Sequence, residues 1–443
     1  MVPQDFIDEI KCILGEETDS FLASFDEKPI RSFRINPLKT DIDVFMSKDI
    51  KEAIDSKVPW CAYGFYLNDS ELSLSVGKHP YHDAGVYYIQ EASAMAPVEE
   101  LDVNPGDRVL DLCASPGGKS TQIAGYLKGE GILISNEINP QRAKILSENI
   151  ERMGVSNALV LNHSADSLVN KFEGYFNKIL VDAPCSGEGM FRKNPEAIGE
   201  WSLENVSLCA DRQKEILDAA IAMLEYGGRL VFSTCTFSNR EDEESVDYVL
   251  NTYPEMKLIK MDKLWPHKVK GEGHFLAVFI KGEEKERVED VLPPCGIEKT
   301  INIKEVKDYV DFIKAAISDE SRGRFIEGAN LLCFGDELYL LPLNSPKMKG
   351  LKVLRSGLHL GTLKKNRFEP AHALALFLKP GMVKNEIKVS YDAARAYLHG
   401  ETIYAEGENG WGLITIDGYS LGWGKMVNGM VKNHYPKGLR TQW

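Results

Sequence analysis

The chain of 443 residues is 43% hydrophobic and 27% charged and carries a net charge of −14, as expected of a globular protein too long for a single core. No apolar run approaches the roughly 18 residues of a membrane span, and the acidic N-terminus lacks the pattern of a secretory signal. We therefore expect a cytoplasmic protein without membrane contact. The eight cysteines include no CxxC pair and no cluster with histidine at metal-ligand spacing, so we also expect reduced thiols and no bound metal.

The N-terminal segment, residues 1–95, starts with a helical pattern and continues with "PIRSFRINPLKT". In this stretch Arg31 and Arg34 flank apolar residues that alternate as on a short strand. We predict an α+β extension over these residues.

From residue 96 to residue 282, short apolar runs alternate with helical segments. The runs are "DRVLDLCA", "GILISNE", "ALVLNHS", "FNKILVDAP", "GRLVFSTCT", "KLIKMD" and "HFLAVFIKG". Strands that alternate with helices predict a parallel sheet with helices on both faces. The last run follows its predecessor after a short connection, as in a hairpin. We therefore predict an α/β, Rossmann-like fold with a seven-stranded mixed sheet.

Three further units follow the predicted sheet. Residues 283–296 are charged and contain a Pro pair, which predicts a linker. Residues 297–382 mix a helix with short strands and predict an α+β accessory domain. Residues 383–443 are rich in Gly and aromatic residues in short strands, as in a small β-barrel.

The charge is unevenly spread along the chain. Residues 296–443 carry 21 Lys and Arg against 16 Asp and Glu, whereas residues 1–295 carry 31 against 50. Between Glu337 and Glu369 there is no acidic residue but seven cations: Lys347, Lys349, Lys352, Arg355, Lys364, Lys365 and Arg367. A solvated face and a surface for a polyanion both fit this composition.

A ligand loop is predicted in "RVLDLCASPGGKSTQIA", where a strand ends in Gly117 and Gly118 and a helix begins. The glycines allow the backbone to approach a ligand closely. Glu137 ends the next strand, where an acid can bind ribose hydroxyls. The loop has neither the G-x-G-x-x-G pattern of dinucleotide sites nor the P-loop spacing, and the sheet ends in a hairpin. These features favour S-adenosylmethionine as the cofactor.

Two thiols and an acid lie at the ends of the fourth and fifth predicted strands. Cys185 and Asp182 belong to "VDAPCSGEGMFRK", and Cys235 belongs to "VFSTCTFSN". Neighbouring parallel strands are roughly 5 Å apart, so these side chains should converge on one cleft. A thiolate that adds to C6 of a pyrimidine makes C5 nucleophilic toward a methyl donor, and a carboxyl group can hydrogen-bond the base at N3. The base must be unpaired or flipped out.

Four stretches, in this order, resemble the motifs of the RNA cytosine-5 methyltransferases of the Nop/Sun family: "DLCASPGGKS", "VDAPCSGEGMFRKNP", "STCTFSNREDEESV" and "LWPHKVKGEGHFLAVF". The resemblance covers residues 85–282, and the C-terminal half is similar to RsmF-like bacterial members, which end in a PUA-like barrel. It implies that Cys235 is the nucleophile and that Cys185 assists product release. The cofactor contacts that it implies are Cys113, Ala114, Ser115, Pro116, Gly117, Gly118, Lys119, Glu137, Arg142, Asp166 and Asp182.

Cys185 is the alternative candidate for the nucleophile, because Pro184 and Cys185 resemble the Pro-Cys nucleophile of DNA cytosine-5 methyltransferases. The Thr-Cys-Thr context of Cys235 matches the RNA enzymes and favours Cys235.

Several other polar residues have two interpretations. Lys119 is either a solvated residue of a helix or a contact in the cleft, and Arg192 with Lys193 is either a phosphate contact or an exposed pair. The acids that follow Cys235, in "NREDEESVDYVL", are explained by the dipole of the helix that starts there.

The resemblance implies a SAM-dependent enzyme that forms 5-methylcytosine in 16S ribosomal RNA, free or within the 30S subunit. The N-terminal extension, with Arg31 and Arg34, and the PUA-like unit are then expected to bind RNA. We expect a monomer. Two alternatives stay open: the same chemistry on tRNA, and a non-catalytic RNA-binding assembly factor. Retention of both thiols and Asp182 argues against the second.

Overall fold

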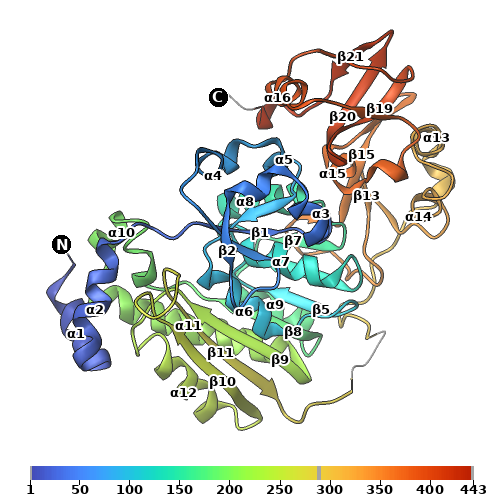
Figure 1. Ribbon diagram of the computed structural model, residues 1–443. Helices are drawn as coiled ribbons and strands as arrows, with labels where there is room; N and C mark the ends of the chain where they lie inside the picture. The colour runs from blue at the N-terminus through green and yellow to red at the C-terminus, as the bar shows by residue number, and fades with distance from the viewer. Residues whose placement is uncertain (1, 287–290, 441–443) are drawn as a thin grey trace.

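The computed structural model of the protein describes residues 2–286 and 291–440 (Figure 1). Part of the linker predicted over residues 283–296, and the last three residues of the C-terminal unit, lie outside these described residues. No helix within residues 2–286 and 291–440 is both long and apolar enough to cross a bilayer, and in the same residues no three His, Cys, Asp or Glu side chains are grouped as metal ligands.

The centre of the protein is an eight-stranded mixed sheet. Its strands, from one edge to the other, are β10 (Met256–Leu264), β11 (His274–Lys281), β9 (Leu224–Thr234), β8 (Phe176–Asp182), β5 (Arg108–Asp111), β6 (Ile132–Asn136), β7 (Ala158–Leu161) and β14 (Val353–Ser356). The five strands from β9 to β7 are parallel, and β10 and β11 form an antiparallel hairpin beside β9. All seven predicted strands are present.

The eighth strand, β14, comes from residues predicted to belong to the accessory domain. It pairs antiparallel with β7, with Ser356 opposite Leu159. Without β14, the N–H and C=O groups along one side of β7 would form a free sheet edge. A strand pattern in the sequence does not show which sheet the strand joins, and this explains the difference between seven and eight strands.

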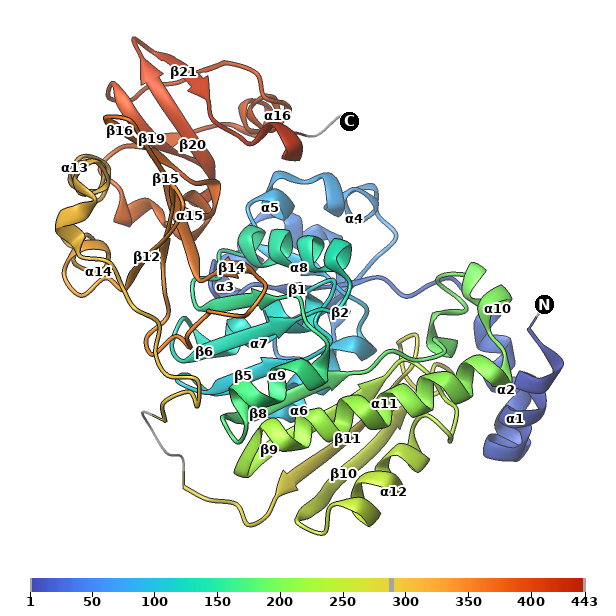
Figure 2. The same cartoon turned by 180° about the vertical axis from the view of Figure 1, so that it is seen from behind.

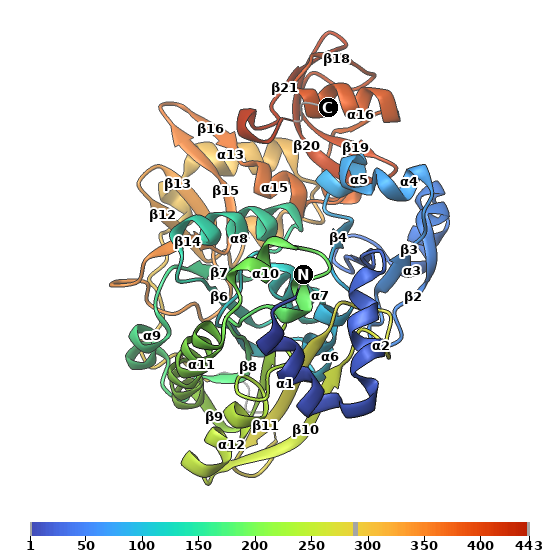
Figure 3. The ribbon, with the colours of Figure 1, turned by 90° about the vertical axis from the view of Figure 1, so that its left-hand side faces the viewer.

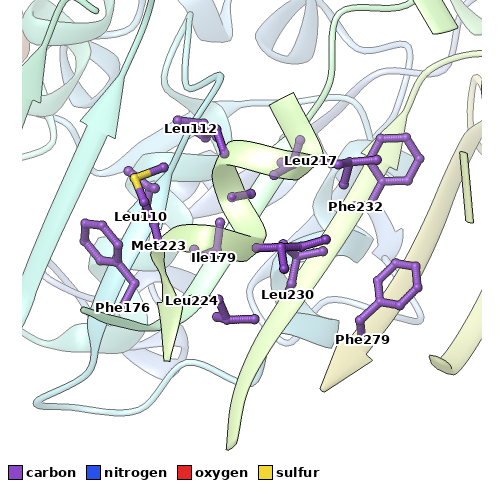
Figure 4. Packing of buried hydrophobic residues seen from close by; sticks show 14 of the residues in the cluster. Leu110, Leu112, Phe176, Ile179, Leu217, Met223, Leu224, Leu230, Phe232 and Phe279 are labelled. Carbon is purple, nitrogen blue, oxygen red and sulfur yellow. The ribbon is translucent and has the colours of Figure 1, made fainter. Parts of the chain in front are cut away.

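Each face of the central sheet has its own hydrophobic core, because successive side chains of a strand point to opposite faces. One face is covered by α6 (Ala96–Leu101), α7 (Gly118–Leu127) and α8 (Pro140–Arg152). The other is covered by α9 (Ala165–Phe172), α11 (Leu203–Met223) and α12 (Glu243–Thr252), and Figure 2 shows α9 and α11 crossing this face. Within β5, Val109 contacts the first core and Leu110 the second (Figure 4).

The N-terminal residues form a four-stranded sheet and several short helices. The strand order is β2 (Ile54–Lys57), β3 (Gly64–Leu67), β1 (Ser32–Ile35) and β4 (Tyr87–Ile89). The helices are α1 (Gln4–Leu14), α2 (Thr18–Ala23), α3 (Ile42–Met46), α4 (Glu71–Leu74) and α5 (Pro80–Asp83). Helices α1 and α2 lie beside α10 (Glu196–Glu200) in Figure 3, and Phe6 and Phe21 pack there against Phe191 and Phe237. The N-terminus therefore covers the segments that follow β8 and β9.

Arg34 does not form an RNA-binding surface, contrary to the expectation from the sequence. Its side chain is 1% exposed and donates hydrogen bonds to Gln90 Oε1 (3.1 Å), to the Gly118 carbonyl (3.1 Å) and to Thr121 Oγ1 (2.9 Å). Arg34 therefore joins the N-terminal sheet to the first turns of α7. Arg31 is half-buried and donates to the Ser73 carbonyl.

Residues beyond the linker form two further sheets at the β14 end of the central sheet (Figure 2). The first contains β12 (Leu331–Phe334), β13 (Glu337–Leu340), β15 (Leu358–Lys364) and β16 (Arg367–Pro370), with α13 (Lys307–Ala316), α14 (Gly323–Ile326) and α15 (His372–Phe377). The second is a curled five-stranded sheet of β17 (Glu386–Lys388), β19 (Gly410–Ile416), β20 (Tyr419–Val427), β21 (Met430–Asn433) and β18 (Ile403–Tyr404), with α16 (Tyr391–His399). Tyr419, Trp423 and Tyr435 are buried, as core residues of the predicted PUA-like unit would be.

The C-terminal sheet packs on the N-terminal extension rather than standing apart from it. Tyr81 Oη donates to Asp417 Oδ2 (2.5 Å), and the Thr40 and Tyr419 hydroxyls are 3.0 Å apart. Both units contribute apolar side chains to one core, for example Phe33 and Leu421. The N-terminal extension and the C-terminal sheet therefore pack directly on each other.

Arg192 is neither an exposed cation nor a phosphate contact. Both the Arg192 and the Glu272 side chains are 2% exposed, and Arg192 Nε lies 2.6 Å from Glu272 Oε2. The guanidinium also donates to the Gly271 carbonyl (2.8 Å) and the Ser24 carbonyl (3.2 Å). The buried ion pair therefore joins the segment after β8 to the β10–β11 loop and to the N-terminal helices.

Replacement of Arg192 by Met should lower the free energy of unfolding by about 3–5 kcal/mol, because Glu272 is left buried without its partner. Lys193→Met, at the exposed neighbouring residue, is the matched control and should change the free energy of unfolding by about 0.5 kcal/mol or less. Urea unfolding followed by circular dichroism measures both variants. Equal stability of the two variants would contradict the structural role of the ion pair.

Candidate active site

Cys185 and Cys235 lie together at the carboxyl edge of the central sheet. β8 ends at Asp182 and β9 at Thr234, and the two strands are parallel neighbours with Asp182 opposite Ser233. The two Sγ atoms are 3.2 Å apart, and the backbone N–H of Cys235 donates to Cys185 Sγ at 3.3 Å. The two thiols therefore face the same small region of space.

The environment of Cys185 favours its protonated form. Its hydrogen bond with the Cys235 sulfur and its burial raise the pKa of Cys185 well above the ordinary value of a thiol. Cys185 therefore keeps its proton at neutral pH. A protonated thiol next to a second sulfur can donate a hydrogen bond to that sulfur.

Asp182 is held in the ionised form at the same edge. Lys119 Nζ lies 2.8 Å from Asp182 Oδ2, Ser233 Oγ donates to Oδ1 at 3.0 Å, and His274 Nε2 lies 3.5 Å from Oδ1. Burial acts to raise the pKa of Asp182, but Lys119 and His274 together keep that pKa below its usual range. Lys119 is thus a buried partner of Asp182 and not a solvated residue of α7.

A cleft of about 1370 Å³ runs along this edge, across the ends of β7, β6, β5, β8 and β9. Both thiols line it, together with six of the residues expected to contact the cofactor: Cys113, Ser115, Glu137, Arg142, Asp166 and Asp182. Five residues expected to contact the cofactor lie outside the lining of the cleft in the described part of the chain: Ala114, Pro116, Gly117, Gly118 and Lys119. Of these five, Lys119 reaches the cleft through its ion pair with Asp182.

Gly117 and Gly118 lie close to neighbouring elements, and their predicted approach to a ligand stays a prediction. A Cβ at Gly117 would lie 3.2 Å from the Leu146 side chain and 3.3 Å from that of Asn149, and its φ of +113° disfavours other residues. A Cβ at Gly118 would lie 3.3 Å from the Tyr88 ring. The two glycines therefore allow α8 and the N-terminal sheet to pack closely on the loop.

The acidic residues of the cleft fit S-adenosylmethionine. Glu137 is 4% exposed; its Oε1 accepts from the Asn139 N–H (2.8 Å) and its Oε2 lies 3.6 Å from the Arg142 guanidinium. An acid held in this way at the end of β6 suits a ribose diol. Asp166 lies beyond it, after β7, and Asp182 lies on the side of the thiols. The carboxylates therefore form a row that ends at two sulfur atoms.

The sequence did not predict that two carboxylates in the segment after Cys235 are buried. Glu241 and Asp242 are both 0% exposed, whereas the sequence pattern explained them only by the dipole of the helix that starts there. Asp242 accepts from Thr234 Oγ1 (2.6 Å) and pairs with Lys263 (2.9 Å), and Glu241 binds Ser186 and Gln213. Burial raises the pKa of Glu241 to about 7. A loop has no periodic pattern, so the sequence does not show which acid of a charged run is buried.

The fold and the cleft together define a class of protein. A Rossmann-like sheet with a row of acids for a nucleoside cofactor, and with two thiols at the end of that row, is typical of S-adenosylmethionine-dependent methyltransferases that use cysteine.

The comparisons with known proteins identify the family. Residues 98–285 match the family described as 16S rRNA methyltransferase RsmB/F, residues 2–92 the N-terminal domain of 16S rRNA methyltransferase RsmF, residues 312–378 the RsmF first C-terminal domain, and residues 384–441 the methyltransferase RsmF PUA domain. The chain is 32% identical to ribosomal RNA small subunit methyltransferase F of Vibrio vulnificus, over 99% of this chain and 97% of the relative, and 31% identical to that of Aeromonas hydrophila over the same shares. The chain therefore belongs to the RsmF family.

Solved structures share the fold of much of the chain. A methyltransferase homolog protein from Pyrococcus horikoshii superposes with a TM-score of 0.57 at 27% identity, over 63% of this chain and 95% of that one. NSun6 from the same organism gives a TM-score of 0.57 at 22% identity, over 64% of this chain and 99% of the other.

Replacement of Lys119 by Met should shift the acidic limb of the pH dependence of kcat/KM to higher pH. Lys119 holds the pKa of Asp182 down, so in the variant burial raises that pKa and the carboxylate is protonated at a higher pH. Activity is then lost earlier as the pH falls. Lys144→Met, on the exposed side of α8, is the control and should keep the wild-type limb. A Lys119→Met profile that overlays the wild-type profile would contradict the role of the ion pair.

Proposed function

We propose that this chain, an S-adenosylmethionine-dependent rRNA methyltransferase, forms 5-methylcytosine in 16S ribosomal RNA through covalent addition of Cys235 to C6 of the base. The observation that carries the proposal is the 3.2 Å contact between the Cys185 and Cys235 sulfurs at the end of an acid-lined cleft. Covalent addition is the step that makes C5 of a pyrimidine nucleophilic.

Three side chains of this chain have separate roles in the proposed reaction. Cys235 adds to C6, while the ionised carboxylate of Asp182 accepts a hydrogen bond from the N3 edge of the base and favours its protonated, more electrophilic form. S-adenosylmethionine, when bound, supplies the electrophilic methyl group that C5 receives. Transfer of the C5 proton to a water molecule and departure of the Cys235 thiolate then restore the ring. Cys185 keeps a proton beside the departing sulfur and so assists that release.

The cofactor contacts expected from the sequence divide into two groups in this proposal. The residues that line the cleft bind the cofactor directly, with Glu137 at the ribose and Asp166 on the far side from the thiols. Ala114, Pro116, Gly117 and Gly118 shape the loop, and Lys119 holds Asp182.

RNA is bound, in this proposal, by the units on both sides of the methyltransferase domain (96–282): the N-terminal extension (1–95), and the accessory (297–382) and PUA-like (383–443) units beyond the linker (283–296). Six of the seven cations singled out in the sequence are exposed: Lys347, Lys349, Lys352, Lys364, Lys365 and Arg367. Arg355 is the exception, because it is buried and paired with Glu151. The exposed cations give an acidic protein a separate basic surface for a polyanion.

The enzyme is proposed to act as a monomer in the bacterial cytoplasm, where ribosomal RNA is found. Incubation of the protein and labelled S-adenosylmethionine with 16S rRNA, 30S subunits and tRNA tests the substrate. Label in tRNA alone would show that tRNA, and not rRNA, is the substrate. A protein that binds rRNA but labels none of the three RNAs would be an assembly factor instead.

Replacement of Cys235 by Ala should abolish both methylation and covalent attachment to RNA, since no thiol remains that adds to C6. Cys185→Ala should instead accumulate a covalent protein–RNA adduct, because addition proceeds and release is slowed. Denaturing gel electrophoresis after incubation with substrate RNA and S-adenosylmethionine separates the two results. The adduct in Cys235→Ala and not in Cys185→Ala would reverse the two roles.

The triple variant Lys364→Ala, Lys365→Ala, Arg367→Ala should weaken RNA binding and reduce its salt dependence. Each lost phosphate contact should lower the slope of log K against log salt by about 0.7 for single-stranded RNA. Filter binding at several salt concentrations measures the slope. Lys128→Ala, which changes a cation at the end of α7, is the control and should leave the slope unchanged. An unchanged slope in the triple variant would place the RNA elsewhere.

A further inference from the structure

Two buried carboxylates connect the segments that carry the two thiols. Glu188 follows Cys185 on one segment, and Glu241 follows Cys235 on the other. The two side chains are 1% and 0% exposed, respectively. Neither lines the cleft, as far as the described residues show.

Each carboxylate accepts a backbone N–H of the opposite segment. Glu241 accepts from the Ser186 N–H at 2.9 Å, and also from the Ser186 hydroxyl. Glu188 accepts from the Phe237 N–H at 2.8 Å. Ser186 directly follows Cys185 and Phe237 lies two residues after Cys235, so the arrangement is reciprocal. We call Glu188 and Glu241 the carboxylate clamp.

Further bonds fix the clamp to its surroundings. Gln213 of α11 donates to Glu241 Oε1 (3.2 Å) and to the Pro184 carbonyl (3.1 Å), and the indole of Trp201 donates to Glu188 Oε1 (2.8 Å). The Ser186 and Thr236 hydroxyls, each next to a thiol, are 2.9 Å apart. The backbone on either side of each thiol is therefore held from at least two directions.

The position of the thiols matters because their roles depend on their separation. A misplacement of reacting groups by about 1 Å can cost on the order of 100-fold in rate. Burial of two carboxylates costs solvation energy, and a well-packed apolar core would stabilise the fold as well or better. Stability alone therefore does not account for two reciprocal acids at this place.

We propose that Glu188 and Glu241 are positioning residues, which hold the Cys185 and Cys235 segments at the spacing that the methylation reaction needs. This inference rests on the proposed function in that it names further residues that the two-thiol reaction requires. It also makes a statement about thiol spacing that can be tested without any RNA.

Thiol spacing is tested with the full chain and the oxidant diamide. Diamide takes two hydrogen atoms from a thiol pair, so that an S–S bond forms and the N=N bond of the reagent is reduced to a hydrazine. Peptide mass spectrometry then measures how fast Cys185 becomes linked to Cys235. Glu188→Gln replaces one of two carboxylate oxygens, each of which accepts from an N–H group, by an NH₂ group that faces a donor, and it should slow this linkage by about tenfold or more.

The same variants are tested for methylation and cofactor binding. Glu188→Gln should lower kcat by about 10- to 100-fold, while the KM for S-adenosylmethionine and the Kd for S-adenosylhomocysteine stay at the wild-type values. Glu244→Gln, at an exposed acid three residues after Glu241, is the control and should match wild type in all measurements. Glu241→Leu, which removes the acceptor of the Ser186 N–H, tests the other half of the clamp and takes the place of Glu188→Gln if that variant does not fold.

The outcomes separate the clamp from the proposed function. A wild-type protein without methylation would refute the proposed function. The rates of Cys185–Cys235 linkage would then be the remaining test of whether the clamp sets the thiol spacing. An active wild type in which Glu188→Gln and Glu241→Leu equal Glu244→Gln in both kcat and linkage rate would overturn the clamp. A parallel loss of kcat and cofactor binding, with an unchanged linkage rate, would also overturn it.

Discussion

The parallel pairing of β8 with β9 is the constraint on which the rest of the site depends. It brings the ends of the two strands to the same edge of the sheet, with Asp182 opposite Ser233, and so sets the two sulfurs 3.2 Å apart. A parallel neighbour needs a long connection, and α11 supplies it while covering the sheet. The same helix carries Gln213, which binds the segment after β8. The spacing of the two thiols therefore depends both on the pairing of β8 with β9 and on the packing of α11 against the sheet.

The surroundings of this edge keep its charged groups in defined states. Asp182 is ionised because Lys119 neutralises its buried charge, and Cys185 stays protonated because it is buried against a second sulfur. The N-terminal extension contributes to the same region, since Arg34 fixes the start of α7, on which Lys119 lies. The extension is thus part of the structure of the site as well as a proposed RNA-binding unit.

The sequence was sufficient to predict the sheet and the meeting of the thiols, because both follow from periodicity and from the geometry of parallel strands. It could not show that β14 would complete the edge of the sheet, because a strand pattern does not name its partner. It also could not show that Arg34 and Arg192 are buried, since a cation has the same sequence pattern whether its side chain meets water or buried acceptors. Glu188 and Glu241 escaped prediction for the same reason, because hydrogen bonds between loops leave no repeat in the sequence.

The most direct test of the central claim is to identify the sulfur that bonds to the base. RNA with 5-fluorocytidine at the target lacks the C5 proton that must leave, so the wild-type enzyme should remain attached after methyl transfer. Peptide mass spectrometry of this adduct should find the nucleotide on Cys235. The nucleotide on Cys185, or no adduct with an RNA that the enzyme methylates in its unmodified form, would contradict the account.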